Sequence, residues 1–305
     1  MTMHELSEDQ FFAQLFARLT VQDRSLVIGP GDDCAALRWH DDYLMLLAVD
    51  QVIGERHYIS KGPEASAPQL AGRKLLARNL SDIAAMGGQP RLCLLSMAFP
   101  PQRDQTWLKA FYEGLIQCAE QYQVAMIGGD LAKSPNDEVA SLTIIGEVRE
   151  NLVLRRSGAQ PGDYLCMTGL CGDSFQSQHH LNFLPRCQEG MWLANNKFAK
   201  AMIDISDGLL LDASRLCRAS HCGLELHMQN LPLRNPQRSL QKSVSDGEDF
   251  ELLFAVAREK LPALQEQWRF AHTPLSVIGS FTADPAIKDQ DGKPLPIEGW
   301  DHLRD

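Results

Sequence analysis

Short apolar runs and longer amphipathic stretches alternate along the chain, which is the pattern of a protein built from both strands and helices. In the first half, four apolar runs have the length of buried strands: residues 43–49, 92–99, 124–128 and 141–148. Helices are expected over residues 66–86, which close with Gly87-Gly88, and over residues 104–121. The second half repeats this rhythm, with later strands expected at residues 251–256 and 275–281. The predicted fold class is therefore α/β with mixed sheets, of the α+β kind.

The chain begins with a predicted helix in the sequence LSEDQFFAQLFARL. Ser7 and Gln10 form a capping-box pattern, and Leu6 and Phe11 are placed as a hydrophobic staple. The segment is acidic and has no basic region before it, so we do not expect a secretory signal.

The length of 305 residues is enough for two domains of ordinary size. The segment RRSGAQPGDYLCMTG combines turn residues with the start of a new strand, which places a boundary near residues 149–154. We therefore expect an N-terminal domain over residues 1–150 and a C-terminal α/β domain over residues 151–305.

Composition and charge narrow the class of protein. Hydrophobic residues make up 44% of the chain and charged residues 22%, as in a soluble globular protein. No apolar run approaches the ~18–20 residues that cross a bilayer, so we expect a cytoplasmic protein without membrane contact. The formal net charge of -10 argues against a nucleic-acid partner. The eight cysteines form no CxxC pair and are expected to be reduced core residues.

Acidic residues recur beside glycine or serine where apolar strands or helices are expected to end. They are Asp32-Asp33 after Gly31, Asp50 after LLAV, Asp82 after Ser81, Asp130 after Gly129, Asp204 and Asp207 around Ile205-Ser206, and Glu248-Asp249 after Gly247. Any one of them is typical of a turn or a helix cap. Together they indicate convergent carboxylates of the kind that hold magnesium ions against phosphates. The chain has no GxxxxGK[ST] motif and no protein-kinase signature set, so a metal-rich nucleotide site is the hypothesis that remains.

The stretch MIDISDGLLLD, residues 202–212, raises a specific question about Asp204. Asp204 follows an apolar run, where a buried carboxylate needs a cation or hydrogen-bond donors. Ser206 and Asp207 are placed to cap the helix expected after Gly208, but a cap gives Asp204 no role.

A series of short motifs along the chain suggests a role for Asp204. They are GPGDDCAAL, DQVIGERHY, NLSDIAAMGGQP, MIGGD, RRSGAQPGDYLCMTG, HLNFLPR, IDISDGL, DGEDFELLF and the terminal GWDH. In this order and across nearly the whole chain, the sequence resembles the bacterial thiamine-monophosphate kinase family of the aminoimidazole-ribonucleotide synthetase superfamily.

The resemblance implies an aminoimidazole-ribonucleotide-synthetase-like fold, with an N-terminal mixed-sheet domain that forms a homodimer and a C-terminal α/β domain. It implies that ATP phosphorylates thiamine monophosphate to thiamine diphosphate by direct in-line transfer, with several Mg²⁺ ions and no covalent nucleophile on the protein. The implied metal ligands are Asp33, Asp50, Asp82, Asp130 and Asp204, with Asp207 at the edge of the cluster. The implied ATP contacts are Gly129, Asp130, Arg156 and Ser206, and the implied thiamine-phosphate contacts are His57, Glu248 and Trp300. On this reading Asp204 is a metal ligand, and Ser206-Asp207 cap a helix whose start faces phosphates.

The chain departs from the family's pattern in three places. Ala48-Val49 stand where the family usually has Ser-Thr, whose hydroxyls help to ligate magnesium, and Leu131 stands where threonine is usual. The segment from Phe175 to Gln178 is also shorter than its counterpart. Since water can replace a lost hydroxyl ligand, we expect an active kinase that binds Mg²⁺ weakly. The alternative is a catalytically weak or inactive protein of the same kind that serves as a binding or regulatory module.

Overall fold

The computed structural model describes residues 6–18 and 23–304. The chain forms two compact units, each built from segments that are distant in sequence. Unit 1 consists of Met1–Asp32, Arg155–Ser174 and Phe198–Asp305, and unit 2 consists of Asp33–Leu154 and Phe175–Lys197. These units depart from the expected division after residue 150, because an N-terminal segment belongs with the second half and residues 175–197 belong with the first.

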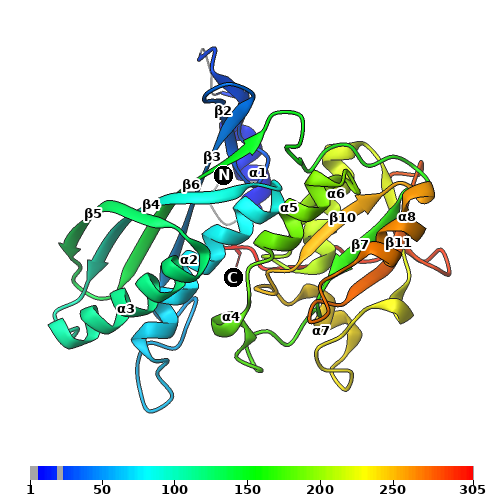
Figure 1. Ribbon diagram of the computed structural model, residues 1–305. Coiled ribbons are helices and arrows are strands. Elements are labelled where there is room, and N and C mark those ends of the chain that lie inside the picture. Colours follow the sequence, from blue (N-terminus) through cyan, green and yellow to red (C-terminus); the bar gives the residue numbers. More distant parts are fainter. Residues whose placement is uncertain (1–5, 19–22, 305) are drawn as a thin grey trace. The chain divides into compact units, whose positions relative to one another are not determined.

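Unit 2 is a mixed sheet with helices on one face, as Figure 1 shows. Its strands lie in the order β2 (Ala35–Arg38), β3 (Tyr43–Ile53), β6 (Val139–Arg149), β4 (Gln89–Phe99) and β5 (Ala125–Lys133). Neighbouring strands are antiparallel except β4 and β5, which are parallel. Two helices, α2 (Pro68–Ala85) and α3 (Gln105–Tyr122), cover one face. The predicted mixed sheet is therefore confirmed.

Helix α2 is the centre of unit 2 because it contacts the sheet, α3 and two short helices. Gly72 lets α3 approach closely, since a Cβ there would lie 1.9 Å from the carbonyl oxygen of Phe111. The helices α4 (His179–Asn182) and α5 (Cys187–Asn195) pack on α2 as well. Arg73 donates to the carbonyl oxygen of Phe183 at 2.5 Å, and a Cβ on Gly190 would lie 2.2 Å from the carbonyl oxygen of Ala84. These contacts explain why residues 175–197 belong to unit 2.

Among the described residues of unit 2, no helix covers the other face of the sheet, which is called the open face below (Figure 1). Apolar side chains alternate onto it from three strands: Leu47 and Val49 of β3, Leu92 and Leu94 of β4, and Ile145 of β6. Val49 keeps 65% of its surface exposed. The alternation puts their neighbours Leu46, Leu95 and Ile144 in the buried layer under α2.

Unit 1 contains a six-stranded mixed sheet. Its strands lie in the order β12 (Ile287–Asp289), β9 (Gly223–Leu226), β11 (Leu275–Thr282), β7 (Tyr164–Thr168), β10 (Leu252–Val256) and β8 (Ala199–Asp204). Only β9 and β12 are parallel neighbours among the described strands of this sheet. Its longest described helix, α6 (Leu209–Ser220), buries Leu209, Leu210, Ala213 and Leu216 in the core formed with these strands. The remaining elements are β1 (Leu26–Ile28), α7 (Leu240–Ser245), α8 (Leu261–Gln267) and the short 3-10 helices η2 (Met228–Asn230) and η3 (Arg258–Lys260).

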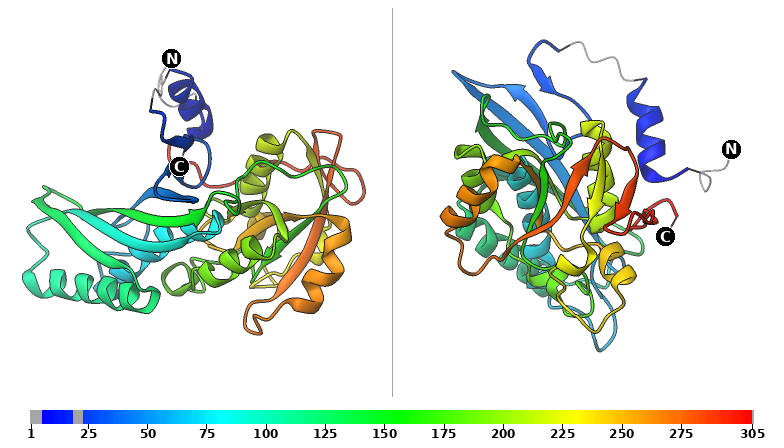
Figure 2. Two further views of the ribbon diagram at one scale, coloured as in Figure 1. Left: turned by 45° about the horizontal axis from the view of Figure 1, so that its top comes forward. Right: turned by 90° about the vertical axis from the view of Figure 1, so that its right-hand side faces the viewer.

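The N-terminal helix α1 (Glu8–Phe16) begins with the predicted capping box, in which the Ser7 side chain accepts from the backbone of Gln10. Asp9 of this helix pairs with Arg215 of α6 at 3.0 Å, and the Glu8 backbone donates to Asp301 at 3.2 Å. Figure 2 shows α1 in blue beside the red C-terminal segment in both views. These contacts place the helix in unit 1, far in sequence from its partners.

No helix in the described part of the chain is both long and apolar enough to span a membrane. All eight cysteines are buried and free of disulfides. Burial raises the pKa of the Cys93 and Cys118 thiols to about 11. The cysteines are therefore packing residues, as expected.

Candidate functional site

Several of the aspartates predicted to lie where strands or helices end are located inside these elements. Asp50 lies within β3, which continues to Ile53, and Asp82 lies within α2. Asp130 lies within β5, because the Gly-Gly-Asp segment pairs with β4 rather than turning away. The prediction that a strand ends there was wrong for Asp50 and Asp130, whereas Asp82 lies inside the helix expected over residues 66–86. The backbone ladder of a sheet continues through an aspartate when its side chain can reach the surface or a partner.

Two carboxylates meet in unit 2. Asp33, just before β2, and Asp82 of α2 each offer an oxygen, and these oxygens lie within 4.8 Å of each other. Mg²⁺ takes oxygen ligands at about 2.0–2.1 Å, so opposite ligands of one ion are about 4 Å apart. The pair therefore fits a Mg²⁺ ion after a small adjustment of either side chain.

Asp50 has a different neighbour, the guanidinium group of Arg78. The Arg78 Nε donates to Asp50 Oδ2 at 2.8 Å, and Nη2 donates to Oδ1 at 3.1 Å. The Asp50 backbone N–H donates to Asn79 Oδ1 at 3.1 Å. Two consecutive residues of α2 thus hold both the side chain and the backbone of Asp50.

His57 is buried in the turn after β3. Its Nδ1 accepts a hydrogen bond from the Ile53 backbone N–H at 3.0 Å, and its carbonyl oxygen accepts from the buried Lys74 at 2.5 Å. Because Nδ1 is an acceptor, a neutral His57 carries its proton on Nε2, which makes Nε2 a donor.

Gly129 and Asp130 lie in the edge strand β5. A Cβ on Gly129 would lie 2.1 Å from the carbonyl oxygen of Leu95, so the close pairing of β5 with β4 requires glycine here. Asp130 pairs with Ser96, which puts its side chain on the open face. Asp50 pairs with the buried Leu142 and belongs to the helix-covered face. Within one chain, the sheet itself separates Asp130 from Asp50.

In unit 1, Asp204 ends β8 and is 3% exposed. The next turn does not use the predicted cap. Gly208 is the N-cap of α6, with no side-chain hydrogen bond, and its φ of 120° suits glycine alone. The Asp212 side chain instead accepts from the backbone N–H groups of Ser206 at 3.1 Å and Asp207 at 3.0 Å. The capping role predicted for Ser206-Asp207 was wrong, because a carboxylate inside the helix folds back onto the turn.

Asp207 and Asp212 share one arginine. Arg215 Nη1 lies 2.6 Å from Asp207 Oδ2 and 2.7 Å from Asp212 Oδ1. Burial raises the pKa of Asp212, and Arg215 opposes this effect. Burial would lower the pKa of Arg215, but the carboxylates of Asp212 and Asp207 outweigh it and raise that pKa. The turn that carries Ser206 and Asp207 is therefore fixed by an internal ion-pair cluster.

Glu248 lies in a second loop, which is tied to the first. Its backbone N–H donates to the Ser206 carbonyl oxygen at 2.7 Å, and Phe250 donates to Ile205 at 2.8 Å. Glu248 and Phe250 have positive φ values of 66° and 51°, which are unusual for residues with a side chain. Such strain is maintained where surrounding contacts impose it, and it is common at functional sites.

The residue after Glu248 anchors this loop. Asp249 is fully buried, and it accepts from the Gly172 backbone at 2.9 Å and from Arg234 at 3.2 Å. Burial raises the pKa of Asp249 well above its usual range.

Trp300 reaches the same turn from the C-terminal segment. Its backbone N–H donates to the Asp207 carbonyl oxygen at 2.8 Å, and the residue is 40% exposed. A Cβ on Gly299 would lie 2.5 Å from that same carbonyl oxygen, so glycine allows the segment to lie against the turn. The structure thus brings together Ser206, Asp207, Glu248 and Trp300, which are separated by up to 94 residues of sequence.

Arg156 lies in the segment that enters unit 1. Its backbone N–H donates to Asp32 Oδ1 at 2.6 Å, and its carbonyl oxygen accepts from Ser220 at 3.2 Å. Arg156 also lowers the pKa of Asp212 through its charge, which places it near the turn of Ser206 and Asp207.

Sequence reasoning missed Arg78, Asp212 and Arg215. The signal for the last two was present, because Asp212 and Arg215 are one helical turn apart and Asp207 is two turns before Arg215. No local pattern signalled the role of Arg78, because its partner Asp50 lies 28 residues earlier on a different element.

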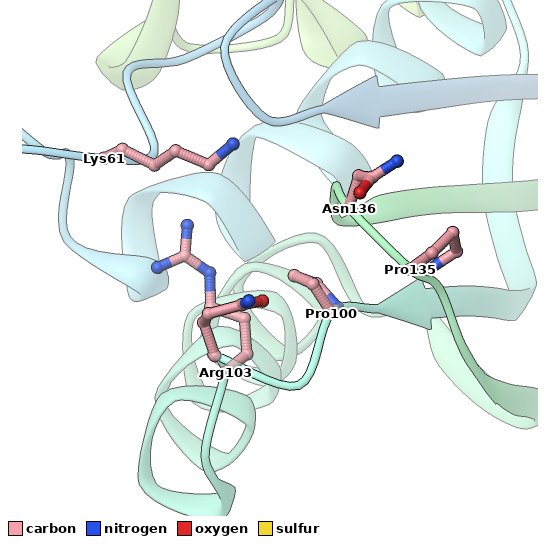
Figure 3. A pocket seen from close by; sticks show the side chains of 6 residues that line it. Lys61, Pro100, Arg103, Pro135 and Asn136 are labelled. Atoms are coloured by element: carbon pink, nitrogen blue, oxygen red, sulfur yellow. The ribbon is translucent and has the colours of Figure 1, made fainter.

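A pocket of about 330 Å³ lies elsewhere in unit 2 and is shown in Figure 3. Lys61 and Arg103 lie on one side of it, and Pro135 and Asn136 on the other (Figure 3). Both cations have protein partners, because Arg103 pairs with Glu138 at 2.7 Å and Lys61 with Asp137 at 3.1 Å. None of the predicted site residues lines this pocket, so it is not part of the candidate site.

Two family models match this sequence. Residues 31–148 match the family described as AIR synthase related protein, N-terminal domain, and residues 161–291 match the corresponding C-terminal domain. The chain is 31% identical to the thiamine-monophosphate kinase of Escherichia coli, over 97% of this chain and 98% of that protein. It is 34% identical to the thiamine-monophosphate kinase of Rhodopirellula baltica, over 85% of this chain and 84% of that protein.

Solved structures agree with these matches. The structure of AaThiL complexed with AMPPCP and TMP superimposes with a TM-score of 0.85 at 26% identity and covers 99% of both chains. Thiamine-monophosphate kinase from Stenotrophomonas maltophilia superimposes with a TM-score of 0.74 at 27% identity, over 94% of this chain and 96% of that one.

Proposed function

Because the chain belongs to the thiamine-monophosphate kinase family, we propose that it transfers the γ-phosphoryl group of ATP to thiamine monophosphate. The products are thiamine diphosphate and ADP. The AaThiL complex with AMPPCP and TMP supports both substrates. The alternative of an inactive binding or regulatory protein is not favoured, because the relatives named above are kinases over nearly their full lengths.

The observation that carries the proposal is the carboxylate pair of Asp33 and Asp82, with oxygens within 4.8 Å. When bound there, Mg²⁺ would neutralise negative charge between two phosphate-bearing substrates. We propose that Asp204, buried at the end of β8, completes this acidic set with Asp130 and, at its edge, Asp207, whereas the Asp50 carboxylate is held by Arg78.

The remaining predicted residues have roles in substrate binding. We assign ATP contacts to Gly129, Arg156 and Ser206, and thiamine-phosphate contacts to His57, Glu248 and Trp300. The Nε2–H of a neutral His57 is a hydrogen-bond donor suited to a phosphate oxygen. The indole of Trp300 offers a face on which the cationic thiazolium ring can stack.

The chemistry requires no nucleophile from the protein. A phosphate oxygen of thiamine monophosphate forms the new bond to the γ-phosphorus of ATP, and the bond from that phosphorus to the β,γ-bridging oxygen breaks. A phosphate monoester is nucleophilic at pH 7 without a general base, so the protein contributes alignment and charge neutralisation. The fixed turn at Ser206-Asp207 and the strained loop at Glu248 are suited to alignment, because neither has to be ordered when substrate binds.

We further propose that two copies pair through the open face of the unit 2 sheet. The exposed apolar residues of that face, Val49 and Leu94 among them, would be buried by a second copy related by two-fold symmetry. Asp130 lies on the same face and would then be directed toward the second copy.

The test of the proposed function is an assay for thiamine diphosphate formed from thiamine monophosphate with ATP and Mg²⁺. Product that depends on all three supports the kinase. Tight binding of thiamine monophosphate without turnover at any Mg²⁺ concentration would instead establish the inactive alternative.

Replacing Trp300 with alanine tests the acceptor pocket. Loss of the stacking and cation–π contact, worth about 1–2 kcal/mol when desolvated, should raise the KM for thiamine monophosphate roughly 5–30-fold. The KM for ATP should change little, and Trp39→Ala, which removes an exposed tryptophan of unit 2, should change neither. Equal increases in both KM values for Trp300→Ala would assign the indole to packing instead.

A further inference from the structure

We propose that Arg78 is a built-in cation that takes the place of one magnesium ion at Asp50, so that this chain holds fewer divalent cations than its carboxylates suggest. This inference rests on the proposed function, because it concerns the metal cluster of the same site. Asp50 was expected to be a metal ligand, but in the structure its carboxylate is already paired with Arg78.

The geometry of the pair is that of a fixed contact. Both oxygens of Asp50 accept from Arg78, at 2.8 and 3.1 Å, which is the bidentate arrangement that binds a carboxylate most strongly. The Arg78 side chain is 11% exposed and that of Asp50 is 27% exposed, so water competes only weakly for either group. The guanidinium keeps its charge at any physiological pH.

The backbone holds Asp50 in the same place. Asn79 accepts from the Asp50 N–H at 3.1 Å, and the Asn79 amide donates to the Leu75 carbonyl oxygen at 2.8 Å, one helical turn earlier. Asn79 is fully buried. Turning the Asp50 carboxylate toward Asp33 and Asp82 would break both of its hydrogen bonds to Arg78, while Asn79 keeps the Asp50 backbone in place.

Charge favours the same conclusion. Asp33, Asp50 and Asp82 contribute three negative charges on this side of unit 2, and Arg78 neutralises one of them. A divalent cation placed on Asp50 would have to displace the guanidinium or lie beside it, and like charges at such distances repel strongly where water is scarce. The carboxylate oxygens of Asp33 and Asp82 lie within 4.8 Å of each other, and we assign Mg²⁺ to this pair.

The position of Ala48 fits this assignment. Ala48 and Asp50 alternate onto the helix-covered face of β3, whereas Val49 points to the open face. A hydroxyl at position 48 would serve as a metal ligand only if a metal ion were bound to Asp50. In this structure the Arg78 guanidinium, which only donates hydrogen bonds, is bound to Asp50 instead.

The double change Ala48→Ser with Val49→Thr should therefore depend on Arg78. In the presence of Arg78, we expect the Mg²⁺ concentration for half-maximal activity to change little. With Arg78→Gln added, the new hydroxyl at position 48 has a metal to ligate, and the half-maximal Mg²⁺ concentration should fall relative to Arg78→Gln alone. The same decrease in both backgrounds would contradict the assignment.

The direct test counts bound cations without turnover. Mn²⁺, which accepts the same oxygen ligands, is titrated into the full-length protein, and free Mn²⁺ is followed by electron paramagnetic resonance. Arg78→Gln should bind about one more Mn²⁺ per chain than the parent, because the freed Asp50 carboxylate becomes a ligand. Arg78→Lys keeps the charge and should keep the parental number. Arg38→Gln, which breaks the exposed pair with Glu150 at 3.3 Å, is the control for the loss of an arginine charge.

A second variant covers the case in which Arg78→Gln does not fold. Asp50→Asn in the parent should leave the number of bound Mn²⁺ ions unchanged, because Arg78 and not a metal contacts that side chain. Loss of one Mn²⁺ in Asp50→Asn, or an unchanged number in folded Arg78→Gln, would overturn the proposal. The Mn²⁺ count needs no thiamine monophosphate, so it tests the role of Arg78 independently of kinase activity. If the protein has no kinase activity but Arg78→Gln binds one more Mn²⁺, the proposed function is disproved and the role of Arg78 is supported.

Discussion

Replacing Asp204 with asparagine is expected to reduce turnover about 10³-fold, which corresponds to about 4 kcal/mol of transition-state stabilisation. The change keeps the size of the side chain and removes only its charge, at a position that is 3% exposed at the end of β8. If Asp204 contacts Mg²⁺, the loss affects the chemical step rather than the fold. Asp130→Asn should have an effect of the same order, although Asp130 is an exposed residue of β5.

The control for this result is another buried carboxylate of unit 1. Asp163 is 6% exposed, accepts from the Gln160 backbone at 2.8 Å and pairs with Lys200 at 2.7 Å. Asp163→Asn should lower the melting temperature and leave the kcat of the folded protein near the parental value. The measurements are kcat at saturating Mg²⁺ and thermal unfolding for each variant. Near-normal kcat in Asp204→Asn would exclude this residue from the metal cluster.

The amino-acid sequence predicted the elements well where hydrophobic periodicity was long. The helices expected at 66–86 and 104–121 correspond to α2 (Pro68–Ala85) and α3 (Gln105–Tyr122), because each buries an apolar face against the sheet. The capping box at Ser7 was also predictable, since both partners are three residues apart.

Long-range packing was harder to predict. Residues 175–197 belong with unit 2 because Arg73 and Gly190 contact segments about 100 residues away in sequence. Nothing in the local pattern of α4 or α5 indicates such partners, since a helix can bury its apolar face against any matching surface.

The sequence predicted which residue types form the candidate site but not which residues contact one another. The carboxylates were identified from their sequence positions, yet only the fold shows that Asp50 is paired with Arg78 and that Asp212 holds the turn at Ser206. Ion pairs depend on distance in space, and periodicity reveals them only when both partners lie on one helix, as Asp212 and Arg215 do.

Two inactive variants should restore each other's activity when they are mixed in one dimer. Asp82 lies on α2, which covers one face of the sheet, while Asp130 lies on the open face proposed to meet a second copy. If Asp130 acts at the partner's site, each site takes Asp82 from one chain and Asp130 from the other. A mixed dimer of one Asp82→Asn chain and one Asp130→Asn chain then has one site with both changes and one site with neither. Random pairing makes about half of the dimers mixed, so about a quarter of the parental activity should return.

The experiment is co-expression of the two variants with different affinity tags, followed by isolation of dimers that carry both tags and measurement of thiamine diphosphate formation. Asp33→Asn with Asp82→Asn is the matched control, because these carboxylates lie within 4.8 Å in one unit and should not restore activity. The expected difference is large, since each variant alone should be about 10³-fold impaired and the isolated mixed dimer about half as active as the parent. Mixed dimers that remain as inactive as the single variants would mean that Asp130 and Asp82 serve the same site from one chain. A chain that stays monomeric at assay concentrations would exclude pairing through the open face.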